Sequence, residues 1–195
     1  MSRLTWFCVD IECSGPIPGL YDMISLGAVR VTHSEEEGYV IGEPLYLEIC
    51  PTAPRVDAGA MKVNGLDLER LKREGLPLVQ AMGKLSEWVA SQTTPGTEPC
   101  FVGHNAPFDW SFVNYAYLAN DLPNPFGYKA LDTKALAMGI LGVHWLDASK
   151  EVLEVALKLP KQDMTLAHRA DYDAWYQALI LARLLERSPE CADLA

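Results

Sequence analysis

Two carboxylates, Asp10 and Glu12, lie two residues apart in Val9-Asp10-Ile11-Glu12-Cys13, at the end of a short apolar run. Side chains at positions i and i+2 of a β-strand point to the same face. Two carboxylates held so closely repel each other unless a cation lies between them, and oxygen ligands suit Mg²⁺ or Mn²⁺. The pair therefore indicates a divalent-metal site. The alternative is two solvated charges at the point where a strand enters a loop.

A second candidate carboxylate lies in Val102-Gly103-His104-Asn105-Ala106-Pro107-Phe108-Asp109. This pattern predicts the end of a buried strand, a turn and the start of a helix, with Asn105 as the N-cap and Pro107 in the first turn. Asp109 then falls in that first turn, where the helix dipole stabilises a negative charge. The alternative is ordinary helix capping, with His104 as a hydrogen-bonded core residue.

The third stretch is His168-Arg169-Ala170-Asp171-Tyr172-Asp173, at the predicted start of the last helix. Histidine titrates near neutral pH, so His168 at the helix entrance is a candidate general base. Asp173 can point into the same cleft, whereas Asp171, two residues earlier, faces another side of the helix. We expect at most one of the two aspartates to join a shared site. The alternative is an acidic helix start that complements the helix dipole.

These residues must be positioned by strands that end beside helix starts. The stretch Glu35-Glu36-Glu37-Gly38 indicates a hairpin turn between the second and third strands. Apolar residues at helical spacing predict a helix that contains Leu78, Met82, Leu85 and Val89. Three strands followed by alternating helices and strands predict an α/β fold with a mixed sheet covered by helices. We expect strands at 5–9, 23–31, 45–49, 100–102 and 128–131, and further helices at 107–120 and 171–187.

The composition favours a single domain, placed at residues 1–187, with a C-terminal tail at 188–195. The sequence contains no apolar run of about 18 residues and no secretory signal, so we expect no membrane partner. The five cysteines are widely spaced and form no C-x-x-C pair, which favours reduced thiols in a cytoplasmic protein. The net charge of −10 argues against tight binding of long duplexes and favours short or single-stranded ends.

Taken together and in this order, the three stretches resemble the DEDDh, or DnaQ-like, family of 3′-to-5′ exonucleases. The family motifs D-x-E, H-N-A-x-F-D and H-x-A-x-x-D match this chain at Asp10, Glu12, Asp109, His168 and Asp173. The similarity covers residues 6–186, including segments between the motifs. The resemblance implies a ribonuclease H-like α/β fold, with a five-stranded mixed sheet flanked by helices.

The resemblance also implies a metal-dependent enzyme that hydrolyses terminal phosphodiesters of single-stranded nucleic acid to nucleoside 5′-monophosphates. Two divalent cations, Mg²⁺ or Mn²⁺, about 3.5–4 Å apart can activate water and stabilise the departing oxygen. The expected general base is His168, and Asp10 is the candidate for bridging both ions. A homodimer is expected from dimeric family members. The expected metal ligands are Asp10, Glu12, Asp109 and Asp173.

Four residues near the motifs are expected to contact the substrate, namely Cys13, Ser14, Asn64 and Phe108. Cys13-Ser14 follows Glu12 where the family usually has threonine, and Asn64 stands where some members carry histidine. Contacts to the terminal nucleotide are therefore expected to differ from the family pattern. Other aromatic residues are candidates for base stacking, with core packing as the alternative for each, namely Trp110, Trp145 and Tyr172.

The acidic surface favours RNA over DNA as the substrate, and a DNA proofreading-type exonuclease is the first alternative. A second alternative is a catalytically silent nucleic-acid-binding module on the same fold, against which the intact set of carboxylates and histidine argues. A third is a phosphatase or another two-metal hydrolase on an unrelated α/β fold. The order of the motifs argues against that third reading.

Overall fold

A computed structural model describes residues 3–188 and contains one mixed sheet in the order β3-β2-β1-β5-β6. Both β3 and β4 pair with the edge of β2 that faces away from β1, so the sheet has five strand positions. The expected mixed sheet flanked by helices is confirmed. The strands are β1 (Leu4–Cys13), β2 (Met23–Ser34), β3 (Gly38–Ile41), β4 (Leu45–Glu48), β5 (Glu98–Gly103) and β6 (Ala130–Asp132).

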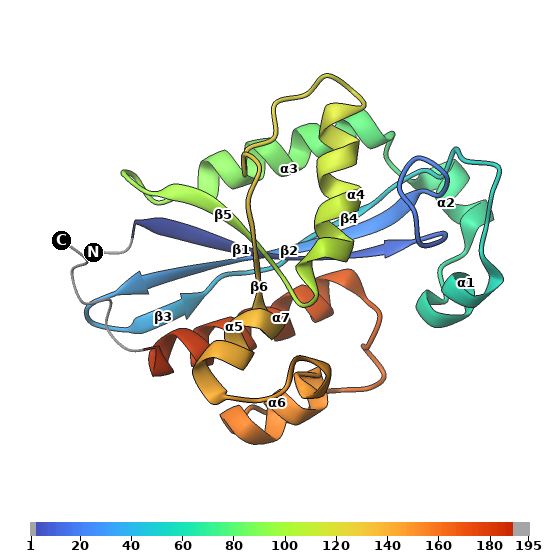
Figure 1. Cartoon of the computed structure of the whole chain (residues 1–195). Helices are drawn as coiled ribbons and strands as arrows, with labels where there is room; N and C mark the ends of the chain where they lie inside the picture. Colours follow the sequence, from blue (N-terminus) through green and yellow to red (C-terminus); the bar gives the residue numbers. More distant parts are fainter. Residues whose placement is uncertain (1–2, 189–195) are drawn as a thin grey trace.

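Helices cover both faces of this sheet (Figure 1). One face carries α3 and α4, which bury Leu85 and Phe112 against Phe7 and Val9 of β1. The other face carries α7, and α5 and α6 pack against the outer side of that helix. The helices are α1 (Ala58–Asn64), α2 (Leu68–Glu74), α3 (Leu78–Gln92), α4 (Ala106–Leu118), α5 (Thr133–Leu141), the 3-10 helix η1 (Trp145–Asp147), α6 (Lys150–Leu157) and α7 (Ala170–Arg187).

The three neighbouring strands β1, β5 and β6 run parallel, with β6 at the edge of the sheet. The carboxyl ends of parallel strands meet at one edge of a sheet, where loops and helix starts build sites in α/β folds. Cys8 pairs with Val102, and Gly103 pairs with Asp132. Asp10 lies two residues after Cys8, and His104 lies two residues after Val102. The first two predicted motifs therefore meet at the same edge of the sheet.

The N-terminal end of α7 presses directly on β2 at Gly27, the register partner of Asp10. A Cβ atom added to Gly27 would lie 2.1 Å from the carbonyl oxygen of Ala170 and 2.4 Å from the amide nitrogen of Asp171. Only glycine permits this approach of backbone to backbone. The contact sets the first turn of α7 beside the end of β1.

The last helix has two buried stripes, which explains its apolar composition. Ala174, Ala178 and Leu181 face the sheet. On the other side, Tyr176 and Ile180 pack against α5 and α6. None of the helices within residues 3–188 is long and apolar enough to cross a membrane.

Several short elements were not predicted from the sequence. The turn at 35–37 is present, but it leads into the four-residue strand β3 before β4 begins. Helices α1, α2, α5 and α6 have seven to nine residues, too few for a helical repeat to stand out in the sequence. The expected strand at 128–131 is instead Ala130–Asp132, and Tyr128 is exposed. Ser188 caps α7, and the rest of the predicted tail, 189–195, lies outside the described residues.

Candidate active site

Asp10 and Glu12 lie on the face of β1 that α7 covers, together with Trp6 and Cys8. The Nε2 atom of Gln177 donates a 2.6 Å hydrogen bond to Oδ1 of Asp10. Gln177 is four residues after Asp173, so the two side chains share one face of α7. We did not predict Gln177 as a site residue, although this spacing is visible in the sequence.

The turn between β5 and α4 places Asp109. Asn105 adopts a left-handed conformation with φ of 68°, and its amide donates to Oδ1 of Asp132 at 3.0 Å. Asn105 occupies the N-cap position, as predicted, although its side chain makes no capping hydrogen bond. Asp109 lies buried in the first turn, as predicted, and its Oδ1 accepts a 3.1 Å hydrogen bond from the amide of Ile11. That bond ties the start of α4 to the end of β1.

The turn before α7 resembles the turn before α4, because each contains a left-handed residue whose amide donates to an aspartate. His168 also adopts a left-handed conformation, with φ of 63°, and its amide donates to Oδ2 of Asp173 at 2.7 Å. Asp173 is buried, whereas Asp171 pairs with Arg169 at 2.8 Å. Only one of the two aspartates therefore joins the carboxylate cluster, as the sequence predicted. A left-handed residue costs energy in a non-glycine position and persists where its surroundings demand it.

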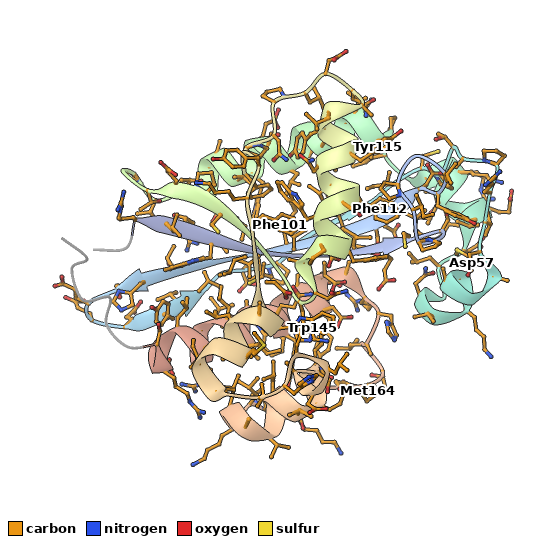
Figure 2. The ribbon with its side chains drawn as sticks, in the orientation of Figure 1. Asp57, Phe101, Phe112, Tyr115, Trp145 and Met164 are labelled. Atoms are coloured by element: carbon orange, nitrogen blue, oxygen red, sulfur yellow. The ribbon has the colours of Figure 1, made fainter. Side chains whose placement is uncertain are left out.

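These segments converge on one cleft of about 340 Å³, whose lining includes all five predicted motif residues. Ligand atoms of Glu12, His168 and Asp173 lie within 4.8 Å of one another. Met164, on the loop before α7, also lines the cleft, and Figure 2 shows it on the opposite side of the sheet from Phe112 and Tyr115 of α4. The structure therefore brings together Asp10, Glu12, Asp109, His168 and Asp173.

The cleft holds its carboxylates away from water and close to one another. Burial raises the pKa of Glu12 to about 8, and the charges of Asp10 and Asp173 add to this effect. Burial also raises the pKa of Asp109 to about 7, although the hydrogen bond from Ile11 opposes it. The pKa of Asp10 stands well above its usual range, chiefly because of burial. Without a cation, this cluster favours protonated carboxyl groups.

One cation of the protein itself reaches this cluster, the ammonium group of Lys150. Its Nζ atom donates a hydrogen bond to Oδ1 of Asp173 and lies 3.9 Å from Oδ1 of Asp10. Burial alone would lower the pKa of Lys150, but the charges of Asp10 and Asp173 outweigh this effect and raise it. No sequence signal marked Lys150, because it lies in none of the three motifs.

The donor set fits hard divalent cations. Carboxylate oxygens are the preferred ligands of Mg²⁺ and Mn²⁺, and the cluster already binds the Lys150 ammonium as a stand-in cation. The buried Oε1 atom of Gln177 has no protein hydrogen-bond partner. The pKa values of Asp10, Glu12 and Asp109 stay raised although Lys150 lies among them, so a divalent ion would stabilise their charged forms further.

His104 takes a supporting position on the cleft wall. Its Nδ1 atom lies 2.9 Å from Oγ1 of Thr133, and burial lowers its pKa to about 4, with contributions from Lys150 and Lys134. The imidazole is therefore neutral at physiological pH. The hydrogen bond to Thr133 agrees with the alternative of His104 as a hydrogen-bonded structural residue.

Of the predicted substrate contacts, only Phe108 lines the cleft, where it is 37% exposed. Cys13 and Ser14 are buried in the adjacent turn, and Oγ of Ser14 accepts from the amide of Asp22 at 2.9 Å. The Nδ2 atom of Asn64 donates to the carbonyl oxygen of Cys13 at 3.1 Å. These three side chains shape the turn after Glu12, and their contact with a nucleotide stays a prediction.

The other aromatic candidates lie away from the carboxylates. Trp110 packs edge-on against Phe101 in the core. Trp145 is partly exposed, with Nζ of Lys134 4.2 Å from its ring centroid. The hydroxyl of Tyr172 accepts from the amide of Asp163 at 2.7 Å. None of the three lines the carboxylate cleft.

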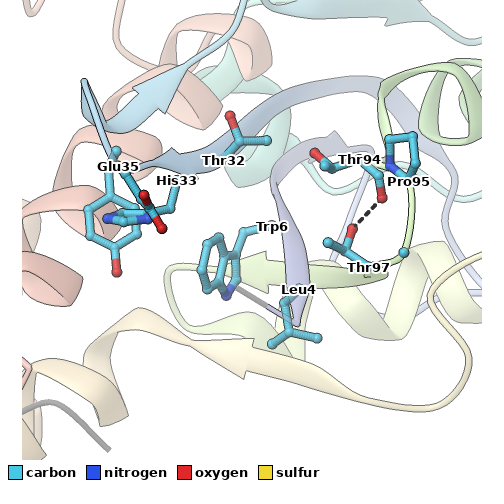
Figure 3. A pocket seen from close by; sticks show the side chains of 10 residues that line it. Leu4, Trp6, Thr32, His33, Glu35, Thr94, Pro95 and Thr97 are labelled. Carbon is cyan, nitrogen blue, oxygen red and sulfur yellow. Dashed lines mark hydrogen bonds between the residues drawn. The ribbon is translucent and has the colours of Figure 1, made fainter. Parts of the chain in front are cut away.

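A larger cavity, of about 640 Å³, lies at the opposite end of β1, around Trp6 (Figure 3). Among the described residues that line it, Glu35 is the only carboxylate, and Thr94 and Thr97 are joined by a 2.8 Å hydrogen bond there. A single acid does not hold two divalent ions. The smaller carboxylate cleft is therefore the candidate active site.

The raised pKa values predict how the metal-free protein responds to pH. Folded Glu12 and Asp109 bind protons more tightly than they do in the unfolded chain, so stability is lost as pH rises from about 5 to 8. In chelator, we expect the melting temperature to fall by at least about 3 °C over this range. Saturating Mg²⁺ or Mn²⁺ binds the ionised carboxylates and should raise the melting temperature most at pH 8. Circular dichroism melts at three pH values, with and without metal, check this; identical curves would contradict it.

Comparison with known proteins places these features in a family. A family model described as an exonuclease matches residues 7–181. The 3′-5′ DNA exonuclease Cap18 of Escherichia coli is 38% identical over 183 residues, which cover 93% of this chain and 91% of the relative. Ribonuclease T of Marinobacter nauticus is 29% identical over 186 residues, which cover 92% of this chain and 81% of the relative.

Solved structures share the fold. The nuclease domain of 3′hExo, a DEDDh family member bound to rAMP, matches with a TM-score of 0.74 at 14% identity, covering 94% of this chain and 91% of that one. Exonuclease I matches with a TM-score of 0.71 at 19% identity, covering 95% of this chain and 41% of that one. The expected ribonuclease H-like fold is confirmed. The family model and these relatives show that the chain is a 3′-to-5′ exonuclease and belongs to the DEDDh family.

Proposed function

We propose that this enzyme removes nucleotides one at a time from the 3′ ends of single-stranded nucleic acid, with single-stranded DNA as its principal substrate, and releases nucleoside 5′-monophosphates. The observation that carries the mechanism is the convergence of four carboxylates and His168 on one cleft. A complete set of this kind argues against the catalytically silent binding module.

The proposed metal ligands are Asp10, Glu12, Asp109 and Asp173, which would hold two divalent cations, Mg²⁺ or Mn²⁺. Such ions supply an activated water and stabilise the charge of the departing oxygen. Asp10 would be the ligand shared by the two ions, because it shares the Lys150 ammonium with Asp173 and feels the charges of both Asp109 and Asp173. Asp109 is fixed by its bond to the amide of Ile11, which holds α4 against β1.

His168 is the proposed general base. It is exposed at the cleft mouth, so its imidazole can take a proton from the attacking water and pass it to solvent. Water forms a new oxygen–phosphorus bond, and the bond between phosphorus and the 3′ oxygen of the preceding nucleotide breaks. That oxygen takes up a proton from solvent and leaves as the 3′-hydroxyl of the shortened strand, so the phosphate stays on the 5′ oxygen of the released nucleotide.

The choice of DNA rests on sequence similarity. The relative named as a DNA exonuclease is 38% identical, whereas the relatives named Ribonuclease T are 29% and 26% identical. RNA, which we expected from the net charge of −10, is the second candidate substrate. It ranks second because an acidic surface disfavours long duplexes but does not distinguish ribose from deoxyribose. A 2′-hydroxyl is the group by which a site can distinguish them.

A substrate panel tests this proposal directly. We expect Mn²⁺-dependent shortening of 3′-unpaired DNA oligomers at least about tenfold faster than RNA oligomers of matched sequence, and slow attack on blunt duplexes. The oligomers carry a 5′ label, and the released product is identified by chromatography against nucleoside 5′- and 3′-monophosphate standards. Faster cleavage of RNA would favour the second candidate, and release of 3′-monophosphates would contradict the proposed bond cleavage.

We further propose a cytoplasmic location and a homodimer. Within the described residues, Cys8, Cys13, Cys50 and Cys100 are free thiols, which suits a reducing compartment. The homodimer rests on resemblance to dimeric family members. Light scattering on the purified protein measures its mass in solution, and a mass of one chain at micromolar concentration would contradict the dimer.

A further inference from the structure

The ammonium group of Lys150 lies inside the carboxylate cluster rather than at the protein surface. It bonds to Asp173, lies 3.9 Å from Asp10, and its side chain is only 19% exposed. Lysine is rarely buried unless it is paired. Here its partners are two of the proposed metal ligands, so a lysine and a divalent ion would bind to the same oxygens.

The position of Lys150 is fixed by the protein frame and not by a flexible loop. Lys150 is the first residue of α6, directly after the N-cap Ser149. Leu153 and Leu157 of this helix are fully or nearly fully buried against α5 and α7. The side chain therefore starts from an anchored backbone and reaches across to the first turn of α7.

A lysine is also a poor choice for this position on helical grounds. The start of a helix carries partial positive charge, which disfavours a cation there. The electrostatic preference of a helix start therefore conflicts with the presence of Lys150, and conflicts of this kind are common at functional sites. The carboxylates of Asp10 and Asp173 stabilise the positive charge of Lys150, which the start of α6 disfavours.

We propose that Lys150 is a resident cation that neutralises the carboxylate cluster when no metal is bound and must be displaced before the full set of divalent ions can bind. This inference rests on the proposed metal site. The ammonium stabilises the metal-free protein and, by the same contacts, weakens divalent-ion affinity. The enzyme consequently needs a higher concentration of divalent ion than the carboxylates alone would require.

The test compares metal binding with the stability of the metal-free protein. In Lys150→Met and in Lys150→Gln, we expect the Mn²⁺ dissociation constant to fall at least about tenfold by isothermal titration calorimetry. In chelator, both variants should melt at a lower temperature than the wild type, and Mn²⁺ should raise their melting temperature more. If Lys150 had only a structural role, its substitution would lower the melting temperature without lowering the Mn²⁺ dissociation constant.

Lys161→Met is the matched control, because it removes the same charge from an exposed loop position. It should bind Mn²⁺ with the affinity of the wild type. If the wild type, the control and both Lys150 variants bound Mn²⁺ equally, the role of Lys150 would be overturned and the metal site would stand. If the wild type and the control bound no Mn²⁺ at all, the proposed metal site would fall and this inference with it.

Discussion

Asp173→Asn is expected to reduce 3′-end hydrolysis by about 10³-fold or more, while Asp171→Asn leaves the rate within about twofold of the wild type. The substitution keeps the size of the side chain and removes one negative charge. Asp173 is buried in the cleft, where it accepts from the amide of His168 and binds Lys150. Loss of its charge removes a ligand from the proposed metal site.

Asp171 is the matched control within the same helical turn. It pairs with Arg169 outside the carboxylate cleft, so the same chemical change there removes only an exposed ion pair. Initial rates on a labelled DNA strand at saturating Mn²⁺ measure both variants, and circular dichroism confirms that each is folded. Equal losses in the two variants, or wild-type rates in Asp173→Asn, would contradict the assignment.

Gly27→Ala is expected to lower both stability and activity, although Gly27 lies outside the cleft lining. The added methyl group would meet backbone atoms of Ala170 and Asp171 at 2.1 to 2.4 Å, and backbone cannot move aside as a flexible side chain can. The first turn of α7 must therefore shift. Overpacking of this kind costs about 3 kcal/mol, or roughly 6–12 °C in melting temperature for a protein of this size.

The same shift displaces Asp173 from Asp10, and a misplacement of about 1 Å can cost roughly 10²-fold in rate. Gly83→Ala in α3 is the control, because apart from its chain neighbours and its own helix backbone no atom of the described residues lies within 4 Å of the added methyl group. That change should leave the rate unaltered and raise stability by about 0.5–1 kcal/mol. Thermal melts and initial rates of the two variants decide the matter; a Gly27→Ala protein that matches the wild type in both would contradict this packing argument.

The chemistry of the site could be predicted from the sequence because it depends on residue types at short spacing. Asp10 and Glu12 share one face of a strand by the two-residue repeat, and Asp109 and Asp173 fall in first helical turns by the capping pattern. The long strands and the long helices α3, α4 and α7 were predicted for the same reason. Helices α3 and α7 carry an apolar stripe at helical spacing, α4 begins with a capping pattern, and the long strands are extended apolar runs.

The contacts between residues far apart in the sequence, and the short helices, could be seen only in the tertiary structure. Lys150 and Asp173 are 23 residues apart and Gln177 and Asp10 are 167 apart, and no local pattern encodes such pairs. The short helices α1, α2, α5 and α6 take their stability from packing, because fewer than about 12 residues seldom hold a helix alone. The local sequence thus set which groups are available for chemistry, and the close packing of α7 on Gly27 decided that they meet.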